Sequence, residues 1–85
     1  MTKTITVRNI ASIREAMGTG EETWATTAPS VAALRHLLAG RSALAALALA
    51  EDQPVRLALN QAMCPPDAPI APGDEVAFFP PVTGG

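Results

Sequence analysis

The chain has 85 residues, of which 48% are hydrophobic and 16% charged, and its formal net charge is −2. This composition predicts one compact domain over residues 1–85, and the scattered basic residues exclude the clustered positive surface that nucleic acid binding needs. No apolar run approaches the length that spans a membrane, and the single cysteine, Cys64, excludes an internal disulfide and favours a reducing cytoplasm.

The first third of the chain predicts a pair of strands. Residues 3–8 alternate between apolar and polar side chains, which is typical of a half-buried strand. Residues 10–17 fit a short helical turn, which the glycine at position 18 ends. Residues 21–27 carry β-branched threonines around a tryptophan and predict the second strand of a hairpin-like pair.

The middle of the chain predicts a main helix and a short second helix. Ser30 is placed to cap the main helix, and Gly40 is expected to end it. Residues 42–50 are rich in alanine and leucine and predict the short helix, with Leu44 and Leu47 turned toward the core. One apolar stripe of the main helix is expected to face the sheet, and it comprises Val31, Leu34, Leu37 and Leu38.

The last third predicts two more strands. Residues 55–59 alternate and predict a strand that ends at Asn60-Gln61, whereas the three prolines at 65–69 cannot continue a central strand. Pro72-Gly73 suits the centre of a type II turn. Residues 74–79 are the expected last strand, with two side chains inward (Val76 and Phe78) and two outward (Ala77 and Phe79).

These elements predict an α+β fold in which a long helix lies on one face of a small mixed sheet, followed by a C-terminal tail over residues 80–85. The apolar faces of the expected strands and the apolar stripe of the main helix together predict a single core. The expected core comprises Ile5, Val7, Val31, Leu34, Leu38, Val55, Leu57, Leu59, Val76 and Phe78.

Side chains that could carry catalysis are nearly absent. His36 is the only histidine, and its place beside Arg35, away from the apolar stripe, indicates a solvated helix residue rather than a general base or metal ligand. Cys64 has no basic neighbour in sequence that would lower its pKa, so packing is favoured over a nucleophilic role.

The C-terminus is the most informative feature. The chain ends in Gly84-Gly85, and a terminal glycine carboxylate has no side chain beside it. Pro80-Pro81 hold the preceding segment extended. A frayed end is the alternative, but Phe79, pointing outward near Met63 and Ile10, favours a partner surface beside a functional tail.

The segment GDEVAFFPPVTGG at residues 73–85 resembles the C-terminal signature of the molybdopterin synthase small subunits, the MoaD-type branch of the MoaD/ThiS family of ubiquitin-like sulfur carriers. The resemblance extends over the whole chain and implies a β-grasp fold. Loop-level departures occur at residues 64–66 and in the alanine-rich second helix. Further resembling segments are Ile13-Arg14-Glu15, Gly18-Thr19, residues 30–34 and Asn60-Gln61.

The resemblance implies a non-catalytic, sulfur-donating subunit that binds no cofactor itself. An E1-like activating enzyme, using ATP and Mg²⁺, would adenylate the carboxylate of Gly85, and a sulfur donor protein would supply sulfur for its conversion to a thiocarboxylate. Gly84 would let the tail thread into the large catalytic subunit of a heterotetramer, where sulfur passes to cyclic pyranopterin monophosphate. The implied partner interface comprises Ile10, Met63, Phe79, Pro80, Pro81, Val82 and Thr83.

Three alternatives remain open from the sequence. A sister carrier for thiamine or cysteine biosynthesis would share the diglycine end and its activation. A ubiquitin-like protein modifier would be joined to lysines through Gly85, and a purely structural interaction domain would tolerate loss of the tail.

Overall fold

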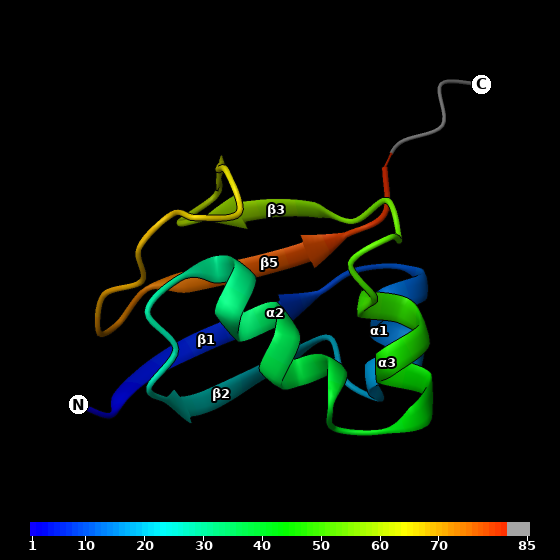
Figure 1. Ribbon diagram of the computed structural model, residues 1–85, viewed down its shortest axis with the longest axis horizontal. Helices are drawn as coiled ribbons and strands as arrows, with labels where there is room; N and C mark the ends of the chain where they lie inside the picture. Colours follow the sequence, from blue (N-terminus) through cyan, green and yellow to red (C-terminus); the bar gives the residue numbers. More distant parts are fainter. Residues whose placement is uncertain (82–85) are drawn as a thin grey trace.

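The computed structural model describes residues 1–81, so expectations for Val82, Thr83, Gly84 and Gly85 lie outside the described residues. The fold of these residues is built on a five-stranded mixed sheet in the order β2-β1-β5-β3-β4 (Figure 1). The strands are β1 (Lys3–Asn9), β2 (Glu21–Thr26), β3 (Arg56–Leu59), β4 (Ala62–Met63) and β5 (Glu75–Phe79).

The first and last long strands lie side by side at the centre of the sheet. β1 runs antiparallel to β2 and parallel to β5, with Val7 opposite Val76. β5 runs antiparallel to β3, with Phe78 opposite Leu57, and β4 pairs with the far edge of β3. The C-terminal segment therefore leaves from the middle of the sheet rather than from an edge.

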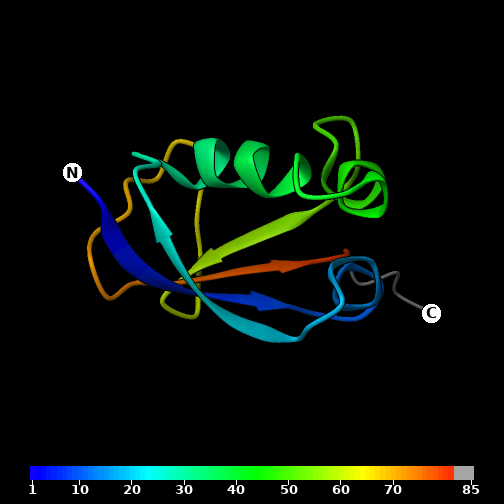
Figure 2. The same ribbon diagram turned by 90° about the horizontal axis from the view of Figure 1, so that it is seen from below.

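The part of the chain that the structure describes also contains three helices: α1 (Ser12–Met17), α2 (Val31–Ala39) and α3 (Ala43–Leu49). Figure 2 shows α2 and α3 over one face of the sheet, whereas the opposite face carries no helix among residues 1–81. The Ser30 Oγ accepts a hydrogen bond from the amide of Ala33 at 3.2 Å, so the expected cap is confirmed. Gly40 follows α2 as expected, although its φ of −78° is not the left-handed conformation common for a glycine there.

The core lies between the helices and the sheet. Most of the residues that were expected in the core are buried there. Val55 and Leu59 are only partly buried and pack against its edge. The members at most 6% exposed are Ile5, Val7, Val31, Leu34, Leu38, Leu57, Val76 and Phe78.

Three leucines expected in the interior are exposed instead. Leu44 and Leu47 are 62% and 70% exposed, and α3 buries Ala45 and Leu49 in their place. Leucine and alanine alternate so closely in this seven-residue helix that two different stripes of side chains could have faced the core. The small side chain of alanine lets α3 approach its neighbours closely. Leu37, at 49% exposed, lies at the edge of the α2 stripe.

The sequence prediction missed the β3–β4 hairpin but placed the end of β3 correctly. Asn60 and Gln61 form its two-residue loop with φ of 50° and 67°, as a type I′ turn requires. The Asn60 carboxamide accepts from the amide of Glu75 at 3.0 Å, which ties the hairpin to β5. The turn before β5 is confirmed, since Gly73 has a φ of 85° and the Asp74 amide donates to Ala71.

An ion pair joins the edge strand β2 to the loop between α2 and α3. The Arg41 guanidinium donates to the Glu22 carboxylate and lies over the ring of Trp24, 5.2 Å from its centroid. The hydrogen bonds from Arg41 lower the pKa of Glu22, and burial of the carboxyl opposes them. No local pattern in the sequence predicts this contact, because it connects residues that are 19 positions apart.

This ion pair predicts a specific sensitivity to acid. Since the folded pKa of Glu22 lies below the unfolded value, its stabilisation is present at neutral pH and is lost as the pH falls through the lowered pKa. The free energy of unfolding should therefore fall more steeply below about pH 4.3 in the wild type than in Glu22→Gln. Urea denaturation of both proteins between about pH 7 and pH 3 measures the difference. Parallel profiles would show that the pair contributes nothing.

Candidate functional site

The helix-free face of the sheet carries the candidate docking residues. Because alternate residues of a strand point to opposite faces, Phe79 and Ala77 share this face of β5 while Phe78 enters the core. Ala77 lies opposite Ala58 of β3, and Ala58 in turn lies opposite Met63 of β4. The strand register therefore brings together residues that are far apart in the sequence.

Ile10 completes this group from the end of β1. Its amide donates to the carbonyl of Phe78 at 3.1 Å, which holds Ile10 beside the last residue of β5. Ile10 is 45% and Met63 60% exposed, and Phe79 is half-buried. We call this apolar surface the outer-face patch, and it comprises Ile10, Ala58, Met63, Ala77 and Phe79.

Two alanines form the flat centre of the patch. Ala77 points outward as predicted, yet it is only 8% exposed, and Ala58 is 6% exposed. Both side chains are small and almost fully covered, so the exposed apolar surface of the patch comes from Ile10, Met63 and Phe79.

Charged side chains surround the patch. Arg56 lies opposite Phe79, and Arg8 lies opposite Ala77. The Arg8 guanidinium is 3.9 Å from the carboxylates of both Glu21 and Glu75, a distance at which exposed pairs add little stability. An apolar centre with a polar rim is the usual anatomy of a protein interface.

The chain turns sharply just after Ile10. Ala11 has φ 56° and ψ −127°, and the amide of Ile13 donates to the carbonyl of Ile10 at 3.2 Å. A non-glycine residue with this backbone conformation is strained, and such strain occurs preferentially at functional sites. The turn fixes the position of Ile10 relative to β5 and was not indicated by the sequence.

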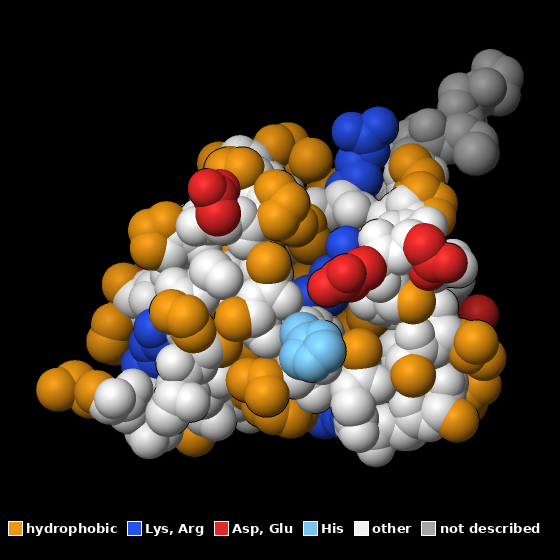
Figure 3. All heavy atoms as spheres, viewed as in Figure 1, with side chains coloured by type: hydrophobic (Ala, Val, Ile, Leu, Met, Phe, Trp, Pro, Cys, Tyr) orange, Lys and Arg blue, Asp and Glu red, His pale blue; other side chains and the backbone are white. Residues whose placement is uncertain are grey.

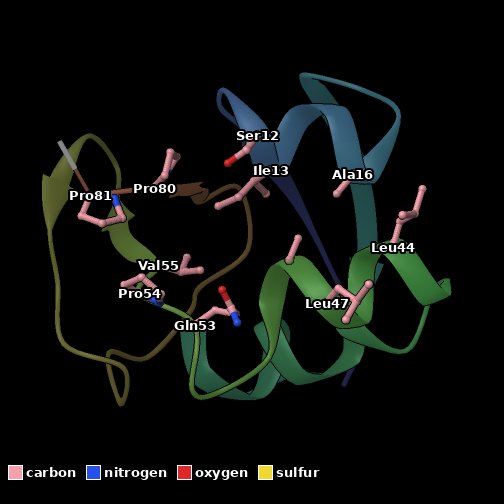
Figure 4. A pocket seen from close by; sticks show the side chains of 11 residues that line it. Ser12, Ile13, Ala16, Leu44, Leu47, Gln53, Pro54, Val55, Pro80 and Pro81 are labelled. Atoms are coloured by element: carbon pink, nitrogen blue, oxygen red, sulfur yellow. The ribbon is translucent and has the colours of Figure 1, made fainter. Parts of the chain in front are cut away.

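The base of the tail lies next to the patch. Pro80 and Pro81 follow β5 directly and are both half-buried. On the side away from the patch they border a groove of about 420 Å³ between α1 and α3 (Figure 4). The groove is lined by Ser12, Ile13, Ala16, Leu44, Leu47, Ala48, Gln53, Pro54, Val55, Pro80 and Pro81. Sequence reasoning missed this groove because it expected Leu44 and Leu47 inside.

Neither of the two other candidate reactive side chains belongs to the outer-face patch, although Cys64 lines a hollow with Met63 and Pro81. His36 is exposed on α2, on the face that Figure 3 shows, as the sequence predicted. Burial raises the pKa of the Cys64 thiol, which disfavours the reactive thiolate form. Within residues 1–81, no three His, Cys, Asp or Glu side chains are placed to hold a metal ion. No helix in the same range is long and apolar enough to cross a membrane.

Comparison with known sequences shows which protein family this chain resembles. The sequence model of the ThiS family matches residues 7–85. The molybdopterin synthase sulfur carrier subunit of Escherichia coli (strain K12) is 48% identical over 81 residues, which cover 95% of this chain and 99% of that protein.

Solved structures confirm the ubiquitin-like β-grasp fold. The crystal structure of the small archaeal modifier protein SAMP1 from Haloferax volcanii superposes with a TM-score of 0.80 at 22% identity, covering 96% of this chain and 99% of that one. A protein–protein complex of subunits 1 and 2 of the molybdopterin-converting factor from Helicobacter pylori contains a chain with a TM-score of 0.62 and 25% identity. This match covers 96% of the present chain and 99% of that one.

Proposed function

Since this chain belongs to the ThiS family, we propose that it is the sulfur carrier subunit of a molybdopterin synthase. The observation that carries the proposal is a diglycine terminus that lies two residues after a Pro-Pro segment, beside an exposed apolar patch. The near full-length similarity to the Escherichia coli carrier supports the same assignment. A protein of this kind needs no catalytic side chain of its own.

In the proposed reaction the carboxylate of Gly85 attacks the α-phosphate of ATP, and pyrophosphate leaves. This step belongs to an activating enzyme, which also supplies the Mg²⁺ site. A carboxylate is a poor electrophile, and the acyl adenylate provides AMP as the leaving group that sulfur from a donor protein replaces. The sulfur of the resulting thiocarboxylate bonds to cyclic pyranopterin monophosphate, and water then cleaves its bond to the Gly85 acyl group and returns the carboxylate. Two such transfers supply the two sulfur atoms of the dithiolene of molybdopterin.

The role of this chain is to present the carboxylate. Gly84 adds no side chain where the tail enters an active site, and Pro80-Pro81 hold the base of the tail extended. Catalytic residues belong to the large subunit in this proposal, and the assembly is a heterotetramer in the cytoplasm.

The outer-face patch is the proposed docking surface for the large subunit. The Helicobacter pylori structure is a complex of two subunits, and its similar chain supports an assembly of this kind. The patch lies beside the start of the tail, so a protein seated on it is also placed to receive Gly85. Its apolar centre and charged rim suit a heterodimer contact.

Substitution of Phe79 tests this docking surface. Phe79→Ala should weaken association with the large subunit by roughly 2 kcal/mol, which is about 30-fold in Kd, if Phe79 anchors the contact. Titration calorimetry of the purified subunits measures the change. Thr23→Ala is a matched control, because Thr23 is exposed on the same sheet face at the far edge strand. Equal affinity of Phe79→Ala and Thr23→Ala would rule out the patch, provided that both melt like the wild type.

The alternatives predict other partners. Co-purification with a large synthase subunit would favour the molybdopterin branch over a carrier for thiamine or cysteine biosynthesis. A protein modifier would leave Gly-Gly remnants on cellular lysines. Similarity to the archaeal modifier at 22% identity concerns the fold alone.

A further inference from the structure

We propose that the groove between α1, α3 and Pro80-Pro81 is a second docking surface, into which the large subunit inserts an apolar side chain while it holds the tail. This inference rests on the proposed function, because it takes the large subunit as the protein that receives the C-terminus. It adds a contact on the helix side of the molecule, away from the outer-face patch.

The groove is shaped for an apolar occupant. Leu44 and Leu47 project from α3 and are 62% and 70% exposed, and the proline at position 54 borders the groove near Pro80 and Pro81. None of the lining side chains is charged, and only Ser12 and Gln53 are polar. Figure 4 shows side chains from α1, α3 and the base of the tail around one hollow. Exposed leucines that line a concave surface mark an interaction site more strongly than isolated ones.

The position of the groove identifies the occupant. The chain continues from Pro81, which borders the groove, for four residues to Gly85. Four fully extended residues span at most about 13–14 Å. A protein whose active site contacts Gly85 must therefore approach the wall of the groove within that distance. The same segment borders the outer-face patch through Phe79, so one partner can contact both surfaces around the tail.

The area that a stable interface buries also indicates that the large subunit contacts the groove. Stable complexes bury about 800 Å² on each partner. The outer-face patch offers three large side chains, of which Ile10 and Met63 are 45% and 60% exposed and Phe79 is half-buried. Such side chains supply only part of that area, and the rest must come from the tail and from the surface around its base. The groove is one apolar surface that continues from that base, on the helix side of the molecule.

The test compares two exposed leucines on neighbouring helices. Leu47→Asp places a charge in the groove, and Leu37→Asp places the same charge on α2, where Leu37 is 49% exposed and borders no part of the groove. We expect Leu47→Asp to raise the Kd for the purified large subunit at least about tenfold, and Leu37→Asp to change it less than about twofold. Leu47→Ala, which only shortens the side chain, should give an intermediate effect. Melting curves of all variants confirm that each is folded.

Four results would overturn the inference. The first is wild-type affinity of Leu47→Asp. The second is tighter binding by Leu47→Asp, which would indicate that the chain's own tail competes for the groove. The third is self-association of the wild type that Leu47→Asp abolishes, which would assign the groove to a second copy. The fourth is an effect on adenylation alone, which would assign it to the activating enzyme.

These results remain distinct from a failure of the proposed function. If Phe79→Ala and removal of Gly85 act as expected while Leu47→Asp is silent, only the second surface is wrong. If removal of Gly85 has no effect on product formation, the sulfur-carrier assignment itself fails.

Discussion

Deletion of Gly85 should abolish molybdopterin formation without changing the melting temperature. The deletion shortens the tail by about 3.3–3.6 Å, and a misplacement of about 1 Å in an active site can already cost about 100-fold in rate. Among residues 1–81, the last side chain of the buried core is Phe78, seven residues before Gly85, so we expect folding to be unaffected. The measurement is the pterin product formed by the reconstituted activating enzyme, large subunit and carrier.

Gly84→Val keeps the length of the tail and changes its width. A β-branched side chain adds bulk and restricts the backbone at the position that must enter two different active sites. Product formation should be lost as in the deletion, whereas Gly84→Ala should retain more of it. Full product from the Gly85 deletion would show that the diglycine end is an ordinary chain terminus.

Leu34→Ala should lower the free energy of unfolding by about 2–5 kcal/mol. Leu34 is fully buried on α2, so truncation removes apolar contacts and leaves a cavity. Leu37→Ala is the matched control, because Leu37 is on the same helix and 49% exposed. Its effect should be about 0.5 kcal/mol or less. Urea denaturation measures both, and equal losses would contradict the packing of α2 on the sheet.

Much of the fold follows from local patterns in the sequence. The alternation in residues 3–8, the cap at Ser30 and the turn at Gly73 each depend on neighbouring residues, and the structure confirms all three. The pleat of the last strand also predicted which of Phe78 and Phe79 would enter the core.

Features that depend on distant contacts were not predictable in this way. The orientation of α3 is decided by packing against α1 and α2, and an alanine-rich helix of seven residues has no unambiguous apolar stripe. β4 has two residues, which is too short for any periodicity. The ion pair between Glu22 and Arg41 likewise exists only after the chain has folded.

The candidate site likewise has parts that the sequence predicts directly and parts that depend on the folded structure. The Pro-Pro and Gly-Gly pairs lie within the last six residues of the sequence and could be recognised directly. The outer-face patch required the sheet register, which brings Met63 onto the face that carries Phe79. The groove could not be predicted, because it forms only where segments that are far apart in the sequence meet near Pro80. The exposed positions of Leu44 and Leu47 became evident only from the structure.

The intact mass of the chain purified from cells is the most direct test of the sulfur-carrier role. We expect a population that is heavier by the exchange of one oxygen for sulfur at Gly85, and this population should be missing from the Gly85 deletion. Cells that contain the activating enzyme and the sulfur donor provide the right conditions. A chain recovered from such cells only with the mass of the free carboxylate would contradict the account.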